Sequence, residues 1–289
     1  MPKLLIHVGL PKTATTFLQS SYFPQLTNVQ FYGKGGRRYF LDLDSYDART
    51  RNILISQEEM TAQTWSKKNQ IKKGTTQIVK WADTFEQAIV NLKRIFPSAH
   101  LLILFRRQGD FVVSLWRSHL MMGGQEAFTE FYGPGRLFTT SDILIKPKLE
   151  VIRREFGASA TFLSFEDFKQ QGVSYLDAFF ETQKISRDPG VKTKKRPNES
   201  FNGSKLQLVR RLNRWYALLP SSIRLPLAGL GIKPKILLQR GLPFWRPEEE
   251  SEIRRLREEI NETLAEDYRE FERQKFTAGV SAESLGIHV

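Results

Sequence analysis

The sequence of 289 residues contains no cysteine and only four histidines. The absence of cysteine excludes disulfides, thiolate nucleophiles and cysteine-ligated metals. The histidines are scattered along the chain, at positions 7, 100, 119 and 288, and they do not have the spacing of metal ligands. We therefore expect neither a thiol nucleophile nor a metal site built from cysteine or histidine side chains.

Long apolar runs are absent too. No stretch reaches about 18 uninterrupted apolar residues, so no transmembrane helix is predicted. The apolar stretch after Lys3 is short and is interrupted at Pro11 and Lys12, which does not fit a signal peptide. The sequence predicts a soluble, cytoplasmic protein, although a lumenal enzyme trimmed of its anchor would look the same.

Acidic residues are in deficit, because 31 Asp and Glu stand against 44 Lys and Arg, a formal net charge of +13. A surplus of this size suggests an anionic ligand or partner. A nucleotide, an acidic glycan, a nucleic acid and a membrane surface all fit. A basic surface that only aids solubility is the plainer alternative.

Residues 1–20, MPKLLIHVGLPKTATTFLQS, carry the strongest motif. Leu4, Leu5, Ile6 and Val8 form a short apolar run that predicts a strand, which Gly9 and Pro11 end. A segment with helical spacing begins at Phe17. A strand, a tight basic loop and a helix N-terminus make an anion site, where backbone N–H groups, the charge of Lys12 and three threonine hydroxyls can face a phosphate or sulfate. The loop is not a Walker A motif, which requires G-x-x-x-x-G-K-[ST].

The string LPKTATT resembles the 5′-phosphosulfate-binding loop of sulfotransferases, commonly written PKTGTT. The longer string IHVGLPKTATTFLQ is similar to the opening of bacterial sulfotransferases of the carbohydrate type, which use 3′-phosphoadenosine 5′-phosphosulfate (PAPS) as the sulfuryl donor. The resemblance implies that the donor is bound by Pro11, Lys12, Thr13, Ala14, Thr15 and Thr16. Ala14 stands where the family has glycine. We expect it in the first helical turn, which suits alanine, and not at a position that needs a positive φ.

A second anchor follows the strongest predicted strand, Leu101 to Phe105. Arg106 ends that strand, and Ser114 lies eight residues later, inside the next helix. This pair resembles the sulfotransferase segment in which an Arg and a Ser eight residues apart hold the 3′-phosphate of PAPS. The longer pattern RRQ-x5-SLW is similar to the bacterial branch. Arg107 could share the role, but the spacing favours Arg106; a structural ion pair is the alternative.

Sulfuryl transfer to an alcohol is helped by a positioned general base. The string Ser56-Gln57-Glu58, at the end of the third predicted strand, resembles the SSE string of the bacterial branch. Glu58 is therefore the expected base and Glu59 the reserve, while a capping carboxylate is the structural alternative. His7, inside the first strand, is expected to be a packed residue behind the site, and nothing in the spacing singles out His119.

Two later segments bear on ligands. KKRPNESFNGSKLQLVRRLN resembles an R-x-N-x-S element of the same branch, which implies nucleotide binding by Arg196, Asn198 and Ser200; a solvated basic linker is the alternative. Residues 222–245 are apolar but broken by Pro and Gly. That segment could shape the acceptor pocket or make a peripheral membrane contact.

The predicted strands, at 4–8, 28–32, 53–55, 101–105 and 161–165, alternate with helices. This pattern favours an α/β sandwich with a mostly parallel sheet flanked by helices, and the resemblance adds a P-loop NTPase-like arrangement. Helices are predicted at 85–96 with Asp83 or Thr84 as the cap, at 111–122 with Asp110 as the cap, and at 149–156, 175–180, 204–219 and 248–276. We predict a single domain over 1–289, with an α/β nucleotide-binding core at 1–165 and a mostly helical completion at 166–289.

The resemblance implies a PAPS-dependent sulfotransferase that acts on a hydroxyl or amine of a carbohydrate or glycoconjugate, for which an acidic acceptor fits the charge. Lys12 and Glu58 are its expected catalytic residues, and adenosine 3′,5′-bisphosphate is its expected by-product; no metal and no nucleic acid are expected. Two alternatives stay open. A P-loop kinase-like phosphotransferase would need a Gly-Lys-[ST] loop and a magnesium-binding carboxylate. A non-catalytic module that binds polyanions would explain the charge but not the Arg106–Ser114 pair.

Overall fold

The structure of the chain is a computed structural model that describes residues 3–33, 52–58, 60, 81–188, 203–220, 222–223, 226 and 248–277. Several predicted residues lie outside these ranges: Glu59, Arg196, Asn198 and Ser200, together with most of 222–245. The chain divides into two compact units, which are described separately. Met1–Arg107, Leu144–Pro197 and Glu266–Val289 form the first, and Gln108–Ile143 with Asn198–Ala265 forms the second. The prediction of a single domain stays a prediction.

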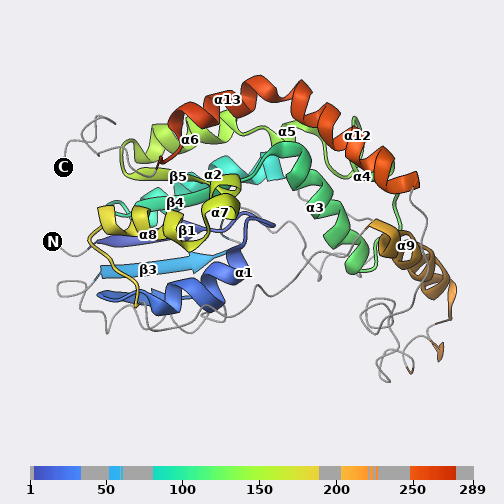
Figure 1. Cartoon of the computed structure of the whole chain (residues 1–289), viewed down its shortest axis with the longest axis horizontal. Coiled ribbons are helices and arrows are strands. Elements are labelled where there is room, and N and C mark those ends of the chain that lie inside the picture. Colours follow the sequence, from blue (N-terminus) through green and yellow to red (C-terminus); the bar gives the residue numbers. More distant parts are fainter. Residues whose placement is uncertain are drawn as a thin grey trace. The chain divides into compact units, whose positions relative to one another are not determined.

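The first unit is built on a five-stranded sheet (Figure 1). Its strands are β1 (Leu4–Val8), β2 (Val29–Tyr32), β3 (Asn52–Gln57), β4 (His100–Phe105) and β5 (Ala160–Ser164). Their order is β2-β3-β1-β4-β5, and every neighbouring pair is parallel. The central strands β1 and β4 are almost wholly buried, as expected of parallel strands covered on both faces. The predicted parallel α/β fold is thus confirmed, and β3 ends at Gln57, two residues later than predicted.

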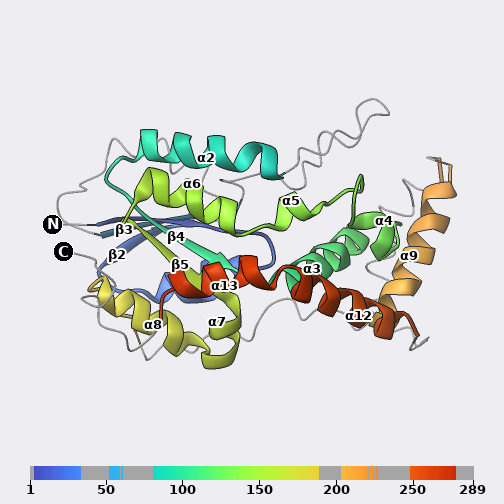
Figure 2. The same cartoon turned by 90° about the horizontal axis from the view of Figure 1, so that it is seen from above.

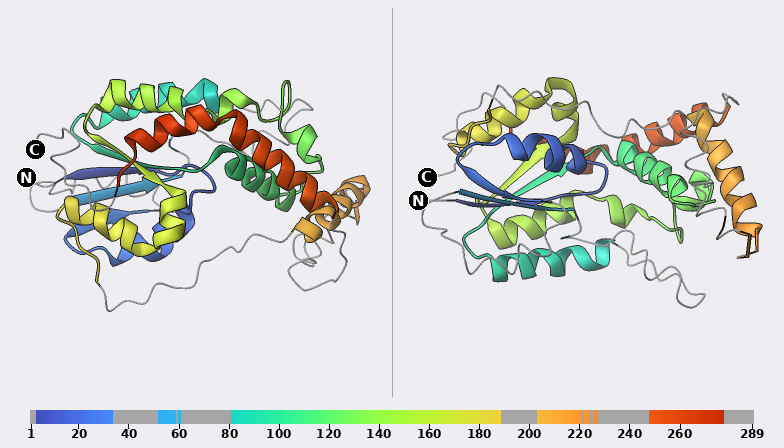
Figure 3. Two further views of the ribbon diagram at one scale, coloured as in Figure 1. Left: turned by 45° about the horizontal axis from the view of Figure 1, so that its top comes forward. Right: turned by 90° about the horizontal axis from the view of Figure 1, so that it is seen from below.

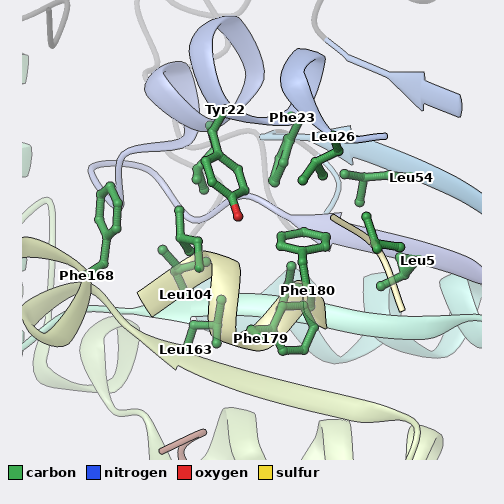
Figure 4. Packing of buried hydrophobic residues seen from close by; sticks show 14 of the residues in the cluster. Leu5, Tyr22, Phe23, Leu26, Leu54, Leu104, Leu163, Phe168, Phe179 and Phe180 are labelled. Atoms are coloured by element: carbon green, nitrogen blue, oxygen red, sulfur yellow. The ribbon is translucent and has the colours of Figure 1, made fainter. Parts of the chain in front are cut away.

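One face of the sheet is covered by the helical segment after β1 and by two helices after β5, as Figures 2 and 3 show. These are α1 (Thr15–Phe17), the π-helical turn η1 (Leu18–Tyr22), the 3₁₀ turn η2 (Phe23–Gln25), α7 (Phe165–Gln171) and α8 (Val173–Thr182). Figure 4 shows Tyr22 and Phe23 packed against Phe180 and the leucines of the sheet. The Tyr22 hydroxyl donates a hydrogen bond of 2.9 Å to Asp177 of α8, so this layer is joined by a polar contact as well.

The opposite face is covered by α2 (Trp81–Ile95) and α6 (Lys146–Phe156). In α2, Phe85, Ile89 and Leu92 are buried, and their spacing places them on one side of the helix. Helix α13 (Ala265–Gln274) also belongs to this unit; its buried Phe271 packs edge-on against Phe105 of β4, with 5.5 Å between the ring centroids. The buried side chains of these helices thus form part of the core of the first unit.

The second unit is helical in its described residues. It contains α3 (Gln108–Met121), α4 (Phe128–Phe131), α5 (Thr140–Ile143), α9 (Gly203–Leu218) and α12 (Glu248–Thr263). Helices α3 and α12 pack closely at Gly109, where an added Cβ would lie 2.3 Å from the carbonyl oxygen of Arg257. The Gly109 N–H donates to Asn261 Oδ1 at 2.8 Å. Only glycine allows this approach, because any side chain would clash with the α12 backbone.

Several predicted helix boundaries are wrong; α6, for example, begins at Lys146 and not at 149. Helix α2 begins at Trp81, so Asp83 and Thr84 lie inside it and do not cap it. Helix α3 begins at Gln108, which makes Asp110 a first-turn residue; its negative charge still suits the positive end of the helix dipole. The predicted helix 248–276 is two helices, α12 and α13, with a break at Leu264.

No helix among the described residues is long and apolar enough to cross a membrane.

A buried polar network joins β1, β3 and the π-helical turn η1. His7 of β1 is fully buried, and its Nδ1 lies 2.7 Å from Ser56 Oγ, its partner in register on β3. The Gln19 side-chain amide donates to both Ser56 Oγ, at 3.1 Å, and the Ser56 carbonyl, at 3.0 Å. Burial lowers the pKa of His7 from 6.5 to about 3, because the imidazolium would lose its hydration there. His7 is therefore neutral at pH 7, a packed residue as predicted.

The His7 pKa predicts how stability depends on pH. The unfolded chain binds a proton at this histidine below pH 6.5, whereas the folded chain does so only near pH 3. The free energy of unfolding therefore falls as the pH drops through this window, by up to about 1.4 kcal/mol per pH unit. Replacing His7 by Gln removes this contribution. Between about pH 7 and about pH 5, the variant should lose about 2 kcal/mol less than the native chain.

Urea unfolding at both pH values measures this difference. His100 remains in both proteins, and its pKa, which burial lowers to about 4, supplies the same background. Equal losses in the two proteins would contradict a neutral buried His7.

Candidate active site

The carboxyl ends of parallel strands meet at one edge of the sheet, which is the usual ligand side of an open α/β sheet. At this edge β1 leads into Gly9, β3 into Glu58, β4 into Arg106 and β5 into Phe165. The N-terminal loop, the expected base and the expected 3′-phosphate arginine therefore lie at the same edge.

The loop after β1 has an alternating backbone conformation. Lys12 and Ala14 have positive φ values of 64° and 63°, whereas Pro11 and Thr13 do not. Alternation of right- and left-handed residues makes a nest, a concavity in which successive backbone N–H groups converge on an anion. The α-helical turn then begins at Thr15. The expectation that Ala14 lies in the first helical turn is wrong: it is the N-cap, and it occupies a left-handed conformation that favours glycine.

Two threonine side chains hold the loop from within. Thr13 and Thr15 are buried, and both hydroxyls donate to the carbonyl of Leu10, at 2.7 and 3.2 Å. These hydroxyls were expected to face a ligand, but in this structure they stabilise the turn. What Thr13 and Thr15 can offer an anion is their backbone N–H groups. Thr16 is half-buried, and its hydroxyl takes no part in the two hydrogen bonds to Leu10.

Gly9 allows the loop to begin close to β3. A Cβ at Gly9 would lie 2.6 Å from Thr15 Cγ2 and 3.1 Å from the Cα of Glu58. The Gly9 N–H donates to the carbonyl of Gln57 at 3.2 Å. Glycine is required here because a side chain would push the loop away from Thr15 and from the segment that carries Glu58. The half-buried Glu58 is therefore adjacent to the start of the loop.

Arg106 joins the end of β4 to the loop. Its Nη1 donates to the carbonyl of Lys12 at 3.1 Å, and its guanidinium carbon lies 4.5 Å from the centre of the Phe165 ring. A cation over an aromatic face is attracted by the ring quadrupole. Arg107, in contrast, is exposed and lies over the ring of Tyr268 at 5.7 Å. Of the two arginines, Arg106 is therefore the one that bonds to the loop after β1, and it is also the one that the spacing to Ser114 favoured.

Glu166 is a part of this edge that the sequence reasoning missed. Its carboxylate accepts the backbone N–H of Arg107 at 3.0 Å and the hydroxyl of Tyr268 at 3.2 Å. Burial raises the pKa of Glu166, and the hydrogen bond from Arg107 and the charge of Arg106 oppose that shift. A carboxylate at the first turn of α7 is common on electrostatic grounds. Nothing in the sequence spacing indicated that Glu166 would accept a hydrogen bond from the backbone just after β4.

Ser114 and His119, the other predicted residues that the structure describes, lie on α3 in the second unit. Ser114 is half-buried, and its pairing with Arg106 stays a prediction. His119, also in that unit, bonds through Nε2 to Glu126, and this hydrogen bond lowers the pKa of the Glu126 carboxyl to about 2. Among the described residues, no group of three or more His, Asp or Glu side chains is placed to hold a metal ion.

The strain at position 14 gives a prediction about stability. A left-handed conformation costs an alanine about 1–2 kcal/mol, whereas glycine adopts it without this cost. Because glycine also adds entropy to the unfolded chain, by about 0.4–1 kcal/mol, the net gain is smaller. Ala14→Gly should raise the free energy of unfolding by about 0.5–1 kcal/mol, and Ala14→Val should lower it. Denaturant unfolding of the three proteins tests the order Gly, Ala, Val; a glycine variant no more stable than the native chain would contradict the strain.

Comparison with known proteins adds a distant likeness of fold. No protein-family model matches the chain, and no curated protein matches it. Among solved structures, the crystal structure of a sulfotransferase from Alicyclobacillus acidocaldarius is similar with a TM-score of 0.45 and 14% sequence identity, over 67% of this chain and 87% of that chain. A likeness at this level carries no argument about activity, so the function must be argued from the residues of this chain.

Proposed function

We propose that the chain is a sulfotransferase that moves a sulfuryl group from PAPS to a hydroxyl or amine of a carbohydrate or glycoconjugate. The observation that carries the proposal is the loop Pro11–Thr15, in which the positive φ values of Lys12 and Ala14 alternate with those of their neighbours as in a nest, and whose backbone is bonded by Arg106. Such a nest binds a tetrahedral oxyanion through N–H groups. Lys12 adds a full positive charge, which suits the phosphosulfate end of the donor.

The rest of the edge supplies what sulfuryl transfer requires. Glu58, adjacent to Gly9, would accept the proton of the acceptor hydroxyl while its oxygen forms a bond to sulfur. The bond between sulfur and the bridging phosphate oxygen breaks, and adenosine 3′,5′-bisphosphate leaves with that oxygen. Lys12 and the N–H groups of the nest would stabilise the negative charge on the sulfuryl and bridging oxygens. His7 is unsuited to the role of base, because it is fully buried.

The 3′-phosphate of the donor would be held by Arg106 and Ser114, as the resemblance implies. A guanidinium offers five N–H donors in a planar fork, and in Arg106 one of them donates to the loop carbonyl. The same residue could thereby hold the loop and meet the phosphate. Arg196, Asn198 and Ser200 are proposed as further nucleotide contacts on the resemblance alone.

Two alternatives make different demands. A P-loop kinase-like enzyme would bind ATP with magnesium, but the glycine-lysine pair of its loop is replaced here by Pro11-Lys12. A module that binds polyanions would show affinity with a strong salt dependence and no preference among nucleotides. Calorimetry with PAPS, adenosine 3′,5′-bisphosphate and magnesium-ATP, the first two in the presence of chelator, separates the three. A turnover screen with radiolabelled PAPS and a panel of glycans then identifies the acceptor.

The 3′-phosphate assignment can be tested by comparing two ligands. Arg106→Ala should weaken binding of adenosine 3′,5′-bisphosphate about 10- to 100-fold, the loss expected for a charge-assisted hydrogen bond. Binding of adenosine 5′-phosphate should weaken much less, and Ser114→Ala should show the same difference to a smaller extent. Calorimetry gives both dissociation constants.

The matched control is Arg107→Ala, which removes the same charge from an exposed neighbour. It should change neither ligand's affinity by more than about twofold. If Arg106→Ala weakens both ligands equally, then Arg106 acts only by supporting the loop, and the 3′-phosphate is held elsewhere.

Glu58→Gln tests the base. The substitution keeps the shape and one acceptor oxygen but removes the proton-accepting carboxylate. Turnover of an acceptor found in the screen should fall about 10²- to 10⁴-fold, with PAPS affinity about unchanged. Lys12→Ala should instead lower both affinity and turnover, since Lys12 would touch the donor as well as the transition state. Glu59→Gln is the neighbouring control; loss of turnover there, with a normal Glu58→Gln, would move the base by one residue.

A further inference from the structure

Helix α9 of the second unit has two unlike faces. Val209 and Asn213, four residues apart, are buried. The Asn213 side-chain amide donates to the carbonyls of Leu120 and Gly124, at 2.8 and 2.7 Å. The Leu120 carbonyl lies in the last turn of α3 and also accepts the N–H of Gly123, and Gly124 follows that helix. Asn213 therefore fixes which side of α9 faces α3, and the opposite side faces outward.

The outward face is apolar and cationic together. Arg211, Arg214, Trp215 and Leu218 follow the i, i+3, i+4, i+7 spacing that places residues on one side of a helix. All four are exposed; Trp215 is 55% and Leu218 83% accessible to solvent. Ile223, five residues beyond, is 48% exposed. A tryptophan and a leucine beside two arginines are what a helix presents when it lies in the headgroup region of a bilayer.

The sequence that contains this helix carries charge of one sign. Residues 200–247 contain three lysines and six arginines but no aspartate or glutamate. Such a stretch is attracted to an anionic surface and has no acidic side chain of its own to neutralise it. Nucleic acid or an acidic glycan would match the charge, but neither explains why Trp215 and Leu218 are exposed between the arginines. A bilayer explains both, because indole and leucine side chains enter its apolar boundary while guanidinium groups meet lipid phosphates.

We propose that the outward face of α9, formed by Arg211, Arg214, Trp215 and Leu218, binds the surface of a bilayer that contains anionic phospholipids. The contact is peripheral: the helix lies along the surface and does not span the membrane. The inference concerns the second unit alone and holds whether or not the chain is a sulfotransferase.

Vesicle co-sedimentation of the full chain tests the proposal. The chain should bind vesicles of phosphatidylcholine with about 30% phosphatidylglycerol and should not bind phosphatidylcholine alone. Replacing Arg211 and Arg214 by Gln should weaken binding about 30-fold, since each arginine near an anionic surface contributes about fivefold. Replacing Trp215 and Leu218 by Ala should weaken it at least tenfold, and this loss should persist at about 0.5 M salt.

Matched controls come from exposed residues elsewhere in the chain. Arg94→Gln with Arg136→Gln removes the same charge, and Ile95→Ala shortens another exposed apolar side chain. Both should bind nearly as the native chain does. Equal losses in these controls would show a general charge effect and would overturn the proposal, as would absence of binding to the anionic vesicles.

A fluorescence measurement gives a second readout that does not require weakened binding. Lipids brominated on their acyl chains should quench the tryptophan emission of the bound native chain. Trp215→Phe keeps an aromatic ring on this face, so binding should continue while most of the quenching disappears. Unchanged quenching would place the membrane contact at another tryptophan. Binding to soluble heparin that is as tight as binding to vesicles, and insensitive to Trp215 and Leu218, would assign the surface to acidic polymers.

Discussion

The hydrogen bond from Arg106 to the carbonyl of Lys12 links the two halves of the proposed donor site within the first unit. The arginine follows the end of β4, an interior strand of the sheet, and it donates to a backbone carbonyl of the loop after the neighbouring strand β1. Phe165, which follows β5, lies under the guanidinium. The neighbouring strands β1, β4 and β5 therefore together position the guanidinium of Arg106. Residues far apart in sequence reach the same point because parallel strands end at a common edge.

The loop that Arg106 holds is strained, and the strain has a physical reason. Lys12 and Ala14 adopt left-handed conformations that cost non-glycine residues about 1–2 kcal/mol each. The buried hydroxyls of Thr13 and Thr15, both bonded to Leu10, oppose relaxation of the turn. Strain of this kind concentrates at sites that must be formed before a ligand arrives. A relaxed loop would turn its N–H groups apart, and an anion would then have to reorganise the backbone on binding.

Much of this fold could be predicted from the sequence, because the sheet is built from strong local signals. The apolar run Leu101 to Phe105 has the composition of a strand buried on both faces, and β4 is that strand. Arg106 was placed correctly at the sheet edge because it directly follows this run. Glu166 was missed for the opposite reason: its function depends on Arg107 and Tyr268, which are distant in sequence. The conformation of Ala14 was also missed, since tertiary contacts and not its own preference set its φ value.

The end of β3 shows why polar residues can extend a strand that sequence patterns would end. Ser56 was expected to lie beyond the strand, yet it is paired with His7 of β1 and buried. Burying its hydroxyl would be costly without partners, and His7 and Gln19 provide them. Gln19 lies in the helical segment that follows the loop, and Ser56 stands two residues before Glu58. The network therefore connects the segment that positions the nest to the segment that positions the proposed base. A shift of either segment has to break a buried hydrogen bond, so this network helps to set the distance between the loop and the proposed base.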